Sequence, residues 1–216
     1  MHDIIEPRYK ILGQQMTMPN VITLLRLPLL VVVVLLICYP GPVKSSAAFV
    51  LLVSLFLMDW LDGYVARRRN ETTNLGSILD IAVDRAVENI LWLTFIAIGL
   101  APLFVGIIFL IRSFLVDGLR SWAQSKKKNA FALMTSGWGK FLVVSRFMRA
   151  FYGLAKAFAF GSLIIFQLIS SFGQAMPPFY FDAVWSIALA SVYLSALLCV
   201  IRGIPVLTDS LILLRQ

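Results

Sequence analysis

Four aspartates lie close together in otherwise apolar sequence, out of eleven acidic residues in this 216-residue chain. They follow the pattern D-x-x-D-G-x-x-A-R, then eight residues, then G-x-x-x-D-x-x-x-D, and are Asp59, Asp62, Asp80 and Asp84. A carboxylate near hydrocarbon is costly unless it is neutralised, so such a cluster indicates a functional site. Divalent cations can neutralise it because they prefer carboxylate oxygen as a ligand. The pattern therefore predicts a metal site.

Helical geometry would place these aspartates on two facing stripes. With about 100° of rotation per residue, Asp59 and Asp62 share one arc of a first helix, and Asp80 and Asp84 share one stripe of a second. The loop between the helices is short, so they are expected to be antiparallel neighbours. Four facing carboxylates need about four positive charges, and two Mg²⁺ ions roughly 3.5–4 Å apart would supply them in a site for phosphoryl chemistry.

Small residues lie on the same two faces, at Gly63, Ala66 and Gly76. They favour equally a slot for a nucleotide with its diphosphate and close packing of membrane helices. Arg67 belongs to the acidic arc, which favours a role beside phosphates or carboxylates over a plain interfacial anchor.

Composition places the chain in a membrane. Hydrophobic residues make up 60% and charged residues 14% of the sequence, its mean hydropathy is +0.88, and soluble domains carry about 25% charged residues. We expect one all-α membrane domain over 1–216, with 1–18 as a juxtamembrane segment. Cys38 and Cys199 lie in apolar runs and predict no disulfide.

Apolar runs long enough to cross a bilayer, about 20 helical residues each, predict six transmembrane helices. Their expected ranges are 21–39, 45–66, 75–100, 103–122, 140–171 and 181–201. Residues 3–15 mix charged and apolar side chains and predict a short interfacial helix. The first apolar run is too long for a signal peptide and lacks a convincing cleavage site.

Basic residues alternate between the loops and predict an orientation. Arg8, the arginines 67–69, the lysines 126–128 and Arg215 lie on one side, whereas the alternate loops carry Lys44 alone. The asymmetry predicts that both termini and the aspartates face the cytoplasm, in the inner membrane if the chain is bacterial. The same basic surface would also attract anionic lipid.

The motif from Asp59 to Asp84 resembles the signature of the CDP-alcohol phosphatidyltransferases at each fixed position. Within that family the chain is most similar to the phosphatidylglycerophosphate synthase branch, on four stretches: 19–26 (PNVITLLR), 75–80 (LGSILD), 112–120 (RSFLVDGLR) and 139–140 (GK). The resemblance covers about residues 18 to 150. It departs at Ser113, where an acid is expected, and at 141–143, where apolar residues replace polar ones.

The resemblance implies transfer of a phosphatidyl group from CDP-diacylglycerol to glycerol 3-phosphate, with release of CMP. It implies two divalent cations, Mg²⁺ or Mn²⁺, on the four aspartates, with Asp84 also the general base, and a homodimer. The residues implied for the donor are Asn20, Thr23, Gly63, Ala66, Arg67 and Gly76.

A phosphorylated acceptor requires cations, and arginine suits phosphate oxygens. The candidates within or beside the later apolar runs are Arg112, Arg120, Lys140 and Arg202. Lys156 and Arg120 are candidates for snorkelling to the interface instead.

Other acceptors stay open: inositol phosphate, serine, or phosphatidylglycerol to give cardiolipin. A divalent-cation or proton transporter is the alternative of another class, but its acids would form a relay across the bilayer, and these cluster near one face. Membrane lipid is an expected partner and nucleic acid is not.

Overall fold

The structure is a computed structural model that describes residues 18–69, 74–125, 137–172 and 177–214. All regular secondary structure within these ranges is helical. The long helices are α1 (Met18–Cys38), α2 (Pro42–Arg69), α3 (Asn74–Ala97), α4 (Leu103–Ser125), α6 (Arg146–Ser170) and α7 (Pro178–Leu214). Two short elements precede α6, namely α5 (Gly137–Gly139) and the π-helical turn η1 (Lys140–Val144).

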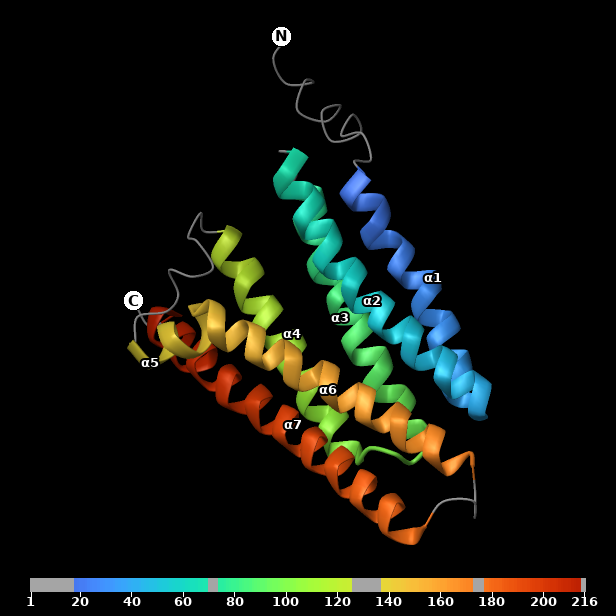
Figure 1. Ribbon diagram of the computed structural model, residues 1–216. Coiled ribbons are helices and arrows are strands. Elements are labelled where there is room, and N and C mark those ends of the chain that lie inside the picture. Colours follow the sequence, from blue (N-terminus) through green and yellow to red (C-terminus); the bar gives the residue numbers. More distant parts are fainter. Residues whose placement is uncertain (1–17, 70–73, 126–136, 173–176, 215–216) are drawn as a thin grey trace, which may run out of the picture.

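The helices form one bundle in which helices distant in sequence also pack against one another. Helix α1 packs against α2 and α3, α6 packs against α2 and α7, and α4 packs against α3 and α7. Figure 1 shows the first three helices side by side, with α6 and α7 crossing below them. The C-terminal end of α2 and the N-terminal end of α1 lie at the same end of the bundle. The aspartate motif belongs to this end.

An aromatic core joins α3, α4 and α6. Trp92 is fully buried and its ring centroid lies 4.8 Å from that of Phe109 and 4.6 Å from that of Phe160. Phe95 stacks on Phe160 at 5.9 Å. Large rings bury much apolar area, and paired rings add about 0.5–1.5 kcal/mol beyond that burial. This core fixes α3 against α6 and so positions the polar residues one or two turns away on both helices.

Four helices are long and apolar enough to cross a membrane by length and composition: Met18–Cys38, Pro42–Val65, Arg146–Ser170 and Phe179–Asp209. Helices α3 and α4, with 24 and 23 residues, are also long enough, but charged residues interrupt their apolar stretches. The expected count of six membrane-crossing helices is therefore not confirmed. The interfacial helix expected at 3–15 lies outside the described residues.

Two expected helix boundaries were wrong. The range 140–171 is not one helix, because η1 ends at Val144 and Ser145 is extended (φ −56°, ψ 133°) before α6 begins. Val143 and Val144 are β-branched and lower the local helix propensity. The last helix does not stop near residue 201 but continues through Pro205 to Leu214. Neighbouring helices and side-chain hydroxyls make such prolines tolerable in membrane helices.

Candidate active site

The aspartates converge as two pairs, Asp59 and Asp62 from α2 and Asp80 and Asp84 from α3. Oxygens of the first three lie within 4.8 Å of one another. Asp62 is buried, whereas the side chains of Asp59 and Asp80 are 40% and 48% exposed. Hard divalent cations take carboxylate oxygens together with water or substrate phosphate. The donor set and its open side therefore fit Mg²⁺ or Mn²⁺.

Arg26 of α1 lies at the centre of the same cluster. Its Nη1 lies 2.6 Å from Asp59 Oδ1 and 3.9 Å from Asp80 Oδ1, and its Nη2 donates to Asp84 Oδ1 at 2.8 Å. The side chain is 2% exposed. We had not predicted this role. The criterion that selected Arg112, a charged residue within an apolar run that needs a partner, also holds for Arg26. Its guanidinium balances part of the negative charge of the cluster.

Arg26→Met is expected to make the stability of the protein depend on divalent cations. Without the guanidinium the carboxylates repel, and the loss stays below the roughly 3–5 kcal/mol of a fully buried pair because Asp59 and Asp84 are 40% and 44% exposed. Thermal unfolding in detergent, with EDTA and with excess Mg²⁺, measures the effect. Mg²⁺ should raise Tm more in the variant than in the wild type or in Lys44→Met. Equal Mg²⁺ shifts in all three proteins would contradict this role of Arg26.

Four of the residues expected to bind the donor are described, and they lie on the three helices that form this cluster. Thr23 Oγ1 donates to Asp62 Oδ2 at 2.8 Å, and Asn20, also buried, lies one turn earlier on α1. Gly63 and Gly76 are half-buried in α2 and α3. Ala66 and Arg67 belong to α2, but their side chains lie outside the described part of the chain. Their donor roles stay predictions.

A second charged cluster lies on the next turns of α3. Arg85 Nη1 donates to Glu88 Oε2 at 2.7 Å, and its Nε lies 3.2 Å from Asp117 Oδ2 of α4. Lys156 of α6 places Nζ 3.0 Å from Glu88 Oε1. Lys156 is thus paired between helices and does not snorkel, which corrects our expectation from the sequence. Glu88 and Asp117 had not been singled out.

Two of the four predicted acceptor residues meet at the ring of Tyr152, on α6. The guanidinium carbons of Arg112 and Arg202 lie 5.5 and 4.8 Å from the ring centroid, within the range of cation–π attraction. Arg202 Nη1 also donates to the Met148 carbonyl at 2.9 Å. The ring therefore holds two cations from α4 and α7 beside α6.

The structure describes no contact between the Tyr152 ring and the other two predicted acceptor residues. Lys140 is exposed in η1. Arg120 lies on α4, but its side chain is outside the described part. Both stay predictions.

A polar cavity of about 200 Å³ connects the aspartates with the second cluster. Its apolar lining is Phe56, Val87, Gly153 and Phe160, and its charged lining is Arg26, Asp59, Asp84, Arg85, Glu88 and Lys156. A small polar molecule bound here would touch Asp84 and the cations at once.

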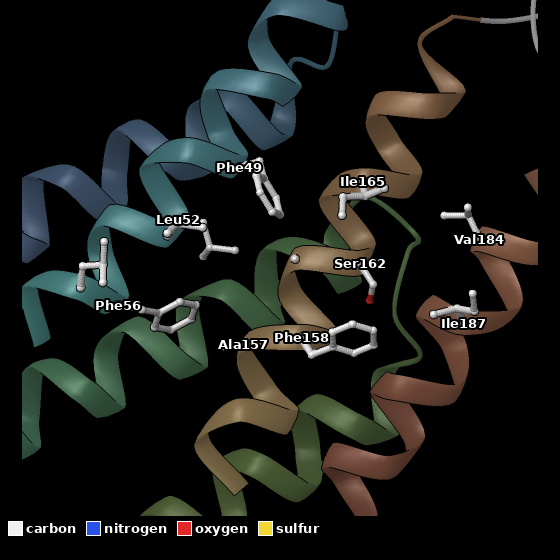
Figure 2. A pocket seen from close by; sticks show the side chains of 12 residues that line it. Phe49, Leu52, Phe56, Ala157, Phe158, Ser162, Ile165, Val184 and Ile187 are labelled. Carbon is white, nitrogen blue, oxygen red and sulfur yellow. The ribbon is translucent and has the colours of Figure 1, made fainter. Parts of the chain in front are cut away.

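An apolar cavity of about 560 Å³ opens between α2, α6 and α7. Figure 2 shows Phe49, Leu52 and Phe56 of α2 facing α6, with Val184 and Ile187 contributed by α7. Phe56 lines both cavities and stands one turn before Asp59. The apolar cavity therefore begins beside the aspartate site.

A family model described as CDP-alcohol phosphatidyltransferase matches residues 16–176, which include the aspartates, Arg112 and Tyr152 but not Arg202. The chain belongs to the CDP-alcohol phosphatidyltransferase family. Membership in this family and the apolar helices make it an integral membrane protein.

Curated relatives carry the name CDP-diacylglycerol–glycerol-3-phosphate 3-phosphatidyltransferase. The Bacillus subtilis protein is 31% identical over 115 residues, 48% of this chain and 60% of its own length. The Pseudomonas fluorescens protein is 32% identical over 118 residues, 50% of this chain and 56% of its own. The Mycoplasma genitalium protein is 28% identical over 164 residues, 71% and 67% of the two chains. In the first two relatives the matched part is less than two thirds of their length.

Proposed function

We propose that the chain transfers a phosphatidyl group from CDP-diacylglycerol to glycerol 3-phosphate and releases CMP. The observation that carries this proposal is the polar cavity, whose lining combines Asp59 and Asp84 with the cations Arg85 and Lys156. A phosphoryl-transfer site needs the carboxylates, and a phosphorylated acceptor needs the cations. The names of the relatives support the same donor and acceptor.

The donor would bind along α2. Asp59, Asp62, Asp80 and Asp84 would hold two Mg²⁺ or Mn²⁺ ions. When bound, these ions would neutralise the diphosphate and the leaving phosphate of CMP. Thr23 keeps the buried Asp62 carboxylate oriented through its hydrogen bond. An acyl chain would enter the apolar cavity, which starts at Phe56 and is lined almost entirely by apolar side chains.

The acceptor would bind in the polar cavity with its hydroxyl at Asp84. The hydroxyl oxygen attacks the phosphorus that carries diacylglycerol, the bond from that phosphorus to the CMP oxygen breaks, and Asp84 takes the hydroxyl proton. A general base must lie within hydrogen-bond reach of that proton, and Asp84 lines the cavity. Arg112 and Arg202 do not line this cavity, but they lie at the Tyr152 ring beside Lys156, which does. An acceptor whose phosphate extends toward that ring would bind to both.

Arg112→Met is expected to raise KM for glycerol 3-phosphate about ten- to a hundredfold, because a lost hydrogen bond to a charged group costs roughly 1.5–3 kcal/mol. KM for CDP-diacylglycerol should change little, since Arg112 does not line the apolar cavity. Initial rates, measured with one substrate varied while the other is saturating, give the two KM values separately. Lys44→Met removes an exposed cation at the start of α2 and serves as control. An unchanged acceptor KM would remove Arg112 from the acceptor site.

We further propose six membrane-crossing helices, a homodimer, and a site that faces the cytoplasm with both termini. Charges at α3 and α4 are compatible with membrane helices that turn them toward the bundle interior, as Glu88 does. The basic residues near the aspartate end support the orientation.

The test of the function is CMP release by detergent-purified protein with CDP-diacylglycerol, Mg²⁺ and one of several acceptors. Glycerol 3-phosphate should give the highest kcat/KM. A better rate with inositol phosphate, serine or phosphatidylglycerol would change the acceptor but keep the transferase. The absence of CMP release with every acceptor would contradict the proposed transferase activity.

A further inference from the structure

The pair of Glu88 and Lys156 is buried between α3 and α6 beside the proposed active site. Their side chains are 6% and 18% exposed, and the distance from Lys156 Nζ to Glu88 Oε1 is 3.0 Å. Removing two charges from water is costly, and a buried ion pair is often no more stabilising than an apolar pair of the same volume. Stability therefore does not explain why this pair occurs at this depth.

The pair also lies on the wall of the polar cavity. Glu88 and Lys156 line it together with Asp84, the proposed base. An ammonium carries three N–H donors, and among the described residues Glu88 alone forms an ion pair with Lys156. Donors of Lys156 are thus available to a ligand in the cavity.

Tyr152 connects Lys156 with the other cations. Lys156 Nζ lies 4.5 Å from the Tyr152 ring centroid, and the guanidinium carbons of Arg112 and Arg202 lie 5.5 and 4.8 Å from it. The Tyr152 hydroxyl is 3.5 Å from Glu88 Oε1, the oxygen that pairs with Lys156. Three cations from three helices therefore surround one ring, and Glu88 anchors the one that reaches the cavity.

The cations of this cluster suit an anion. Lys156 and Arg85 share the carboxylate of Glu88, and the buried Nε and Nη1 of Arg112 have no hydrogen-bond partner among the described residues. A phosphate monoester has a charge of about −1.5 to −2 at pH 7. A phosphorylated alcohol would place negative charge beside Lys156 and Arg112, whereas an uncharged alcohol would not.

We infer that Lys156 binds the phosphate of the acceptor as a specificity-determining residue, and that Glu88 is the positioning residue that holds its ammonium on the cavity wall. The inference rests on the proposed function. With the hydroxyl of the acceptor at Asp84 and its phosphate at Lys156, the cavity selects a small alcohol with an anionic end.

The experiment compares wild type, Glu88→Gln, Lys156→Met and the double variant. Each single change leaves one charge of the pair without its partner, so each should lower Tm. The double variant replaces the pair by two neutral side chains of similar size, so its Tm should exceed that of Glu88→Gln, although Arg85 also loses its contact with the Glu88 carboxylate. Its KM for glycerol 3-phosphate should nevertheless stay raised about tenfold or more, because Lys156 is absent. KM for CDP-diacylglycerol should be unchanged in the double variant.

Inhibition by inorganic phosphate supplies a second readout. Phosphate should compete with glycerol 3-phosphate, and its inhibition constant should rise in the double variant by a factor similar to that in KM. A double variant with wild-type acceptor KM and wild-type phosphate inhibition would show that the pair is structural only. That outcome would leave the proposed function intact. A wild-type protein that releases CMP but does not use glycerol 3-phosphate would overturn both the proposed acceptor and this inference.

Discussion

Asp84→Asn should lower kcat by about 10²–10⁴-fold, the usual contribution of a general base, while the protein still binds CDP-diacylglycerol. Asn keeps an oxygen that can accept from Arg26 Nη2, which lies 2.8 Å from Asp84 Oδ1, so the side chain should stay in place. The amide cannot take the proton of the acceptor hydroxyl. An interaction made in the transition state affects kcat more than substrate affinity.

The measurement pairs steady-state kinetics with direct binding of labelled CDP-diacylglycerol to the purified variant. Asp182→Asn is the matched control, since it neutralises an exposed carboxylate near the start of α7. Its kcat should equal that of the wild type. If Asp84→Asn lost donor binding in proportion to kcat, Asp84 would be chiefly a metal ligand and the base would have to be sought elsewhere.

The approach of the aspartates was predictable because it depends on local rules. Spacing of three and four residues puts Asp59 with Asp62, and Asp80 with Asp84, on one face of each helix. The short connection between α2 and α3 keeps the two motif-bearing helices in one part of the bundle, where both pack against α1. The oxygens within 4.8 Å in the structure agree with that geometry, whereas the roles of the residues stay proposals.

Contacts between distant helices were not predictable from spacing. Arg26 reaches the aspartates because α1 packs against both α2 and α3, and no local pattern specifies that packing. The same holds for Glu88, whose partner Lys156 comes from α6. Pro205 shows the limit of rules that end a helix at proline. In water, proline kinks or ends a helix, but inside a membrane bundle neighbouring groups can take up the freed backbone hydrogen bonds, and α7 continues.

Among the aspartates of the cluster, Asp80 is the one whose change to Asn should weaken the activation by divalent cations most while disturbing the fold least. Asp80 is 48% exposed and lies 3.9 Å from Arg26, whereas Asp59 is 2.6 Å from the same guanidinium. Replacing Asp80 therefore removes a metal ligand while it leaves the closest ion pairs intact. Mutation of a residue that only hydrogen-bonds to a metal ligand lowers metal affinity about 10–100-fold. The loss of a direct ligand should reach or exceed that range.

Initial rates of CMP release, measured from micromolar to millimolar free Mg²⁺ at saturating CDP-diacylglycerol and glycerol 3-phosphate, give the half-saturating Mg²⁺ concentration. It should rise about a hundredfold or more in Asp80→Asn, and Tm in EDTA should stay near the wild-type value because the residue is half exposed. Asp182→Asn should match the wild type in both measurements. An unchanged half-saturating Mg²⁺ concentration in Asp80→Asn would show that the carboxylates do not hold the cation, and the catalytic role proposed for their cluster would fail with it.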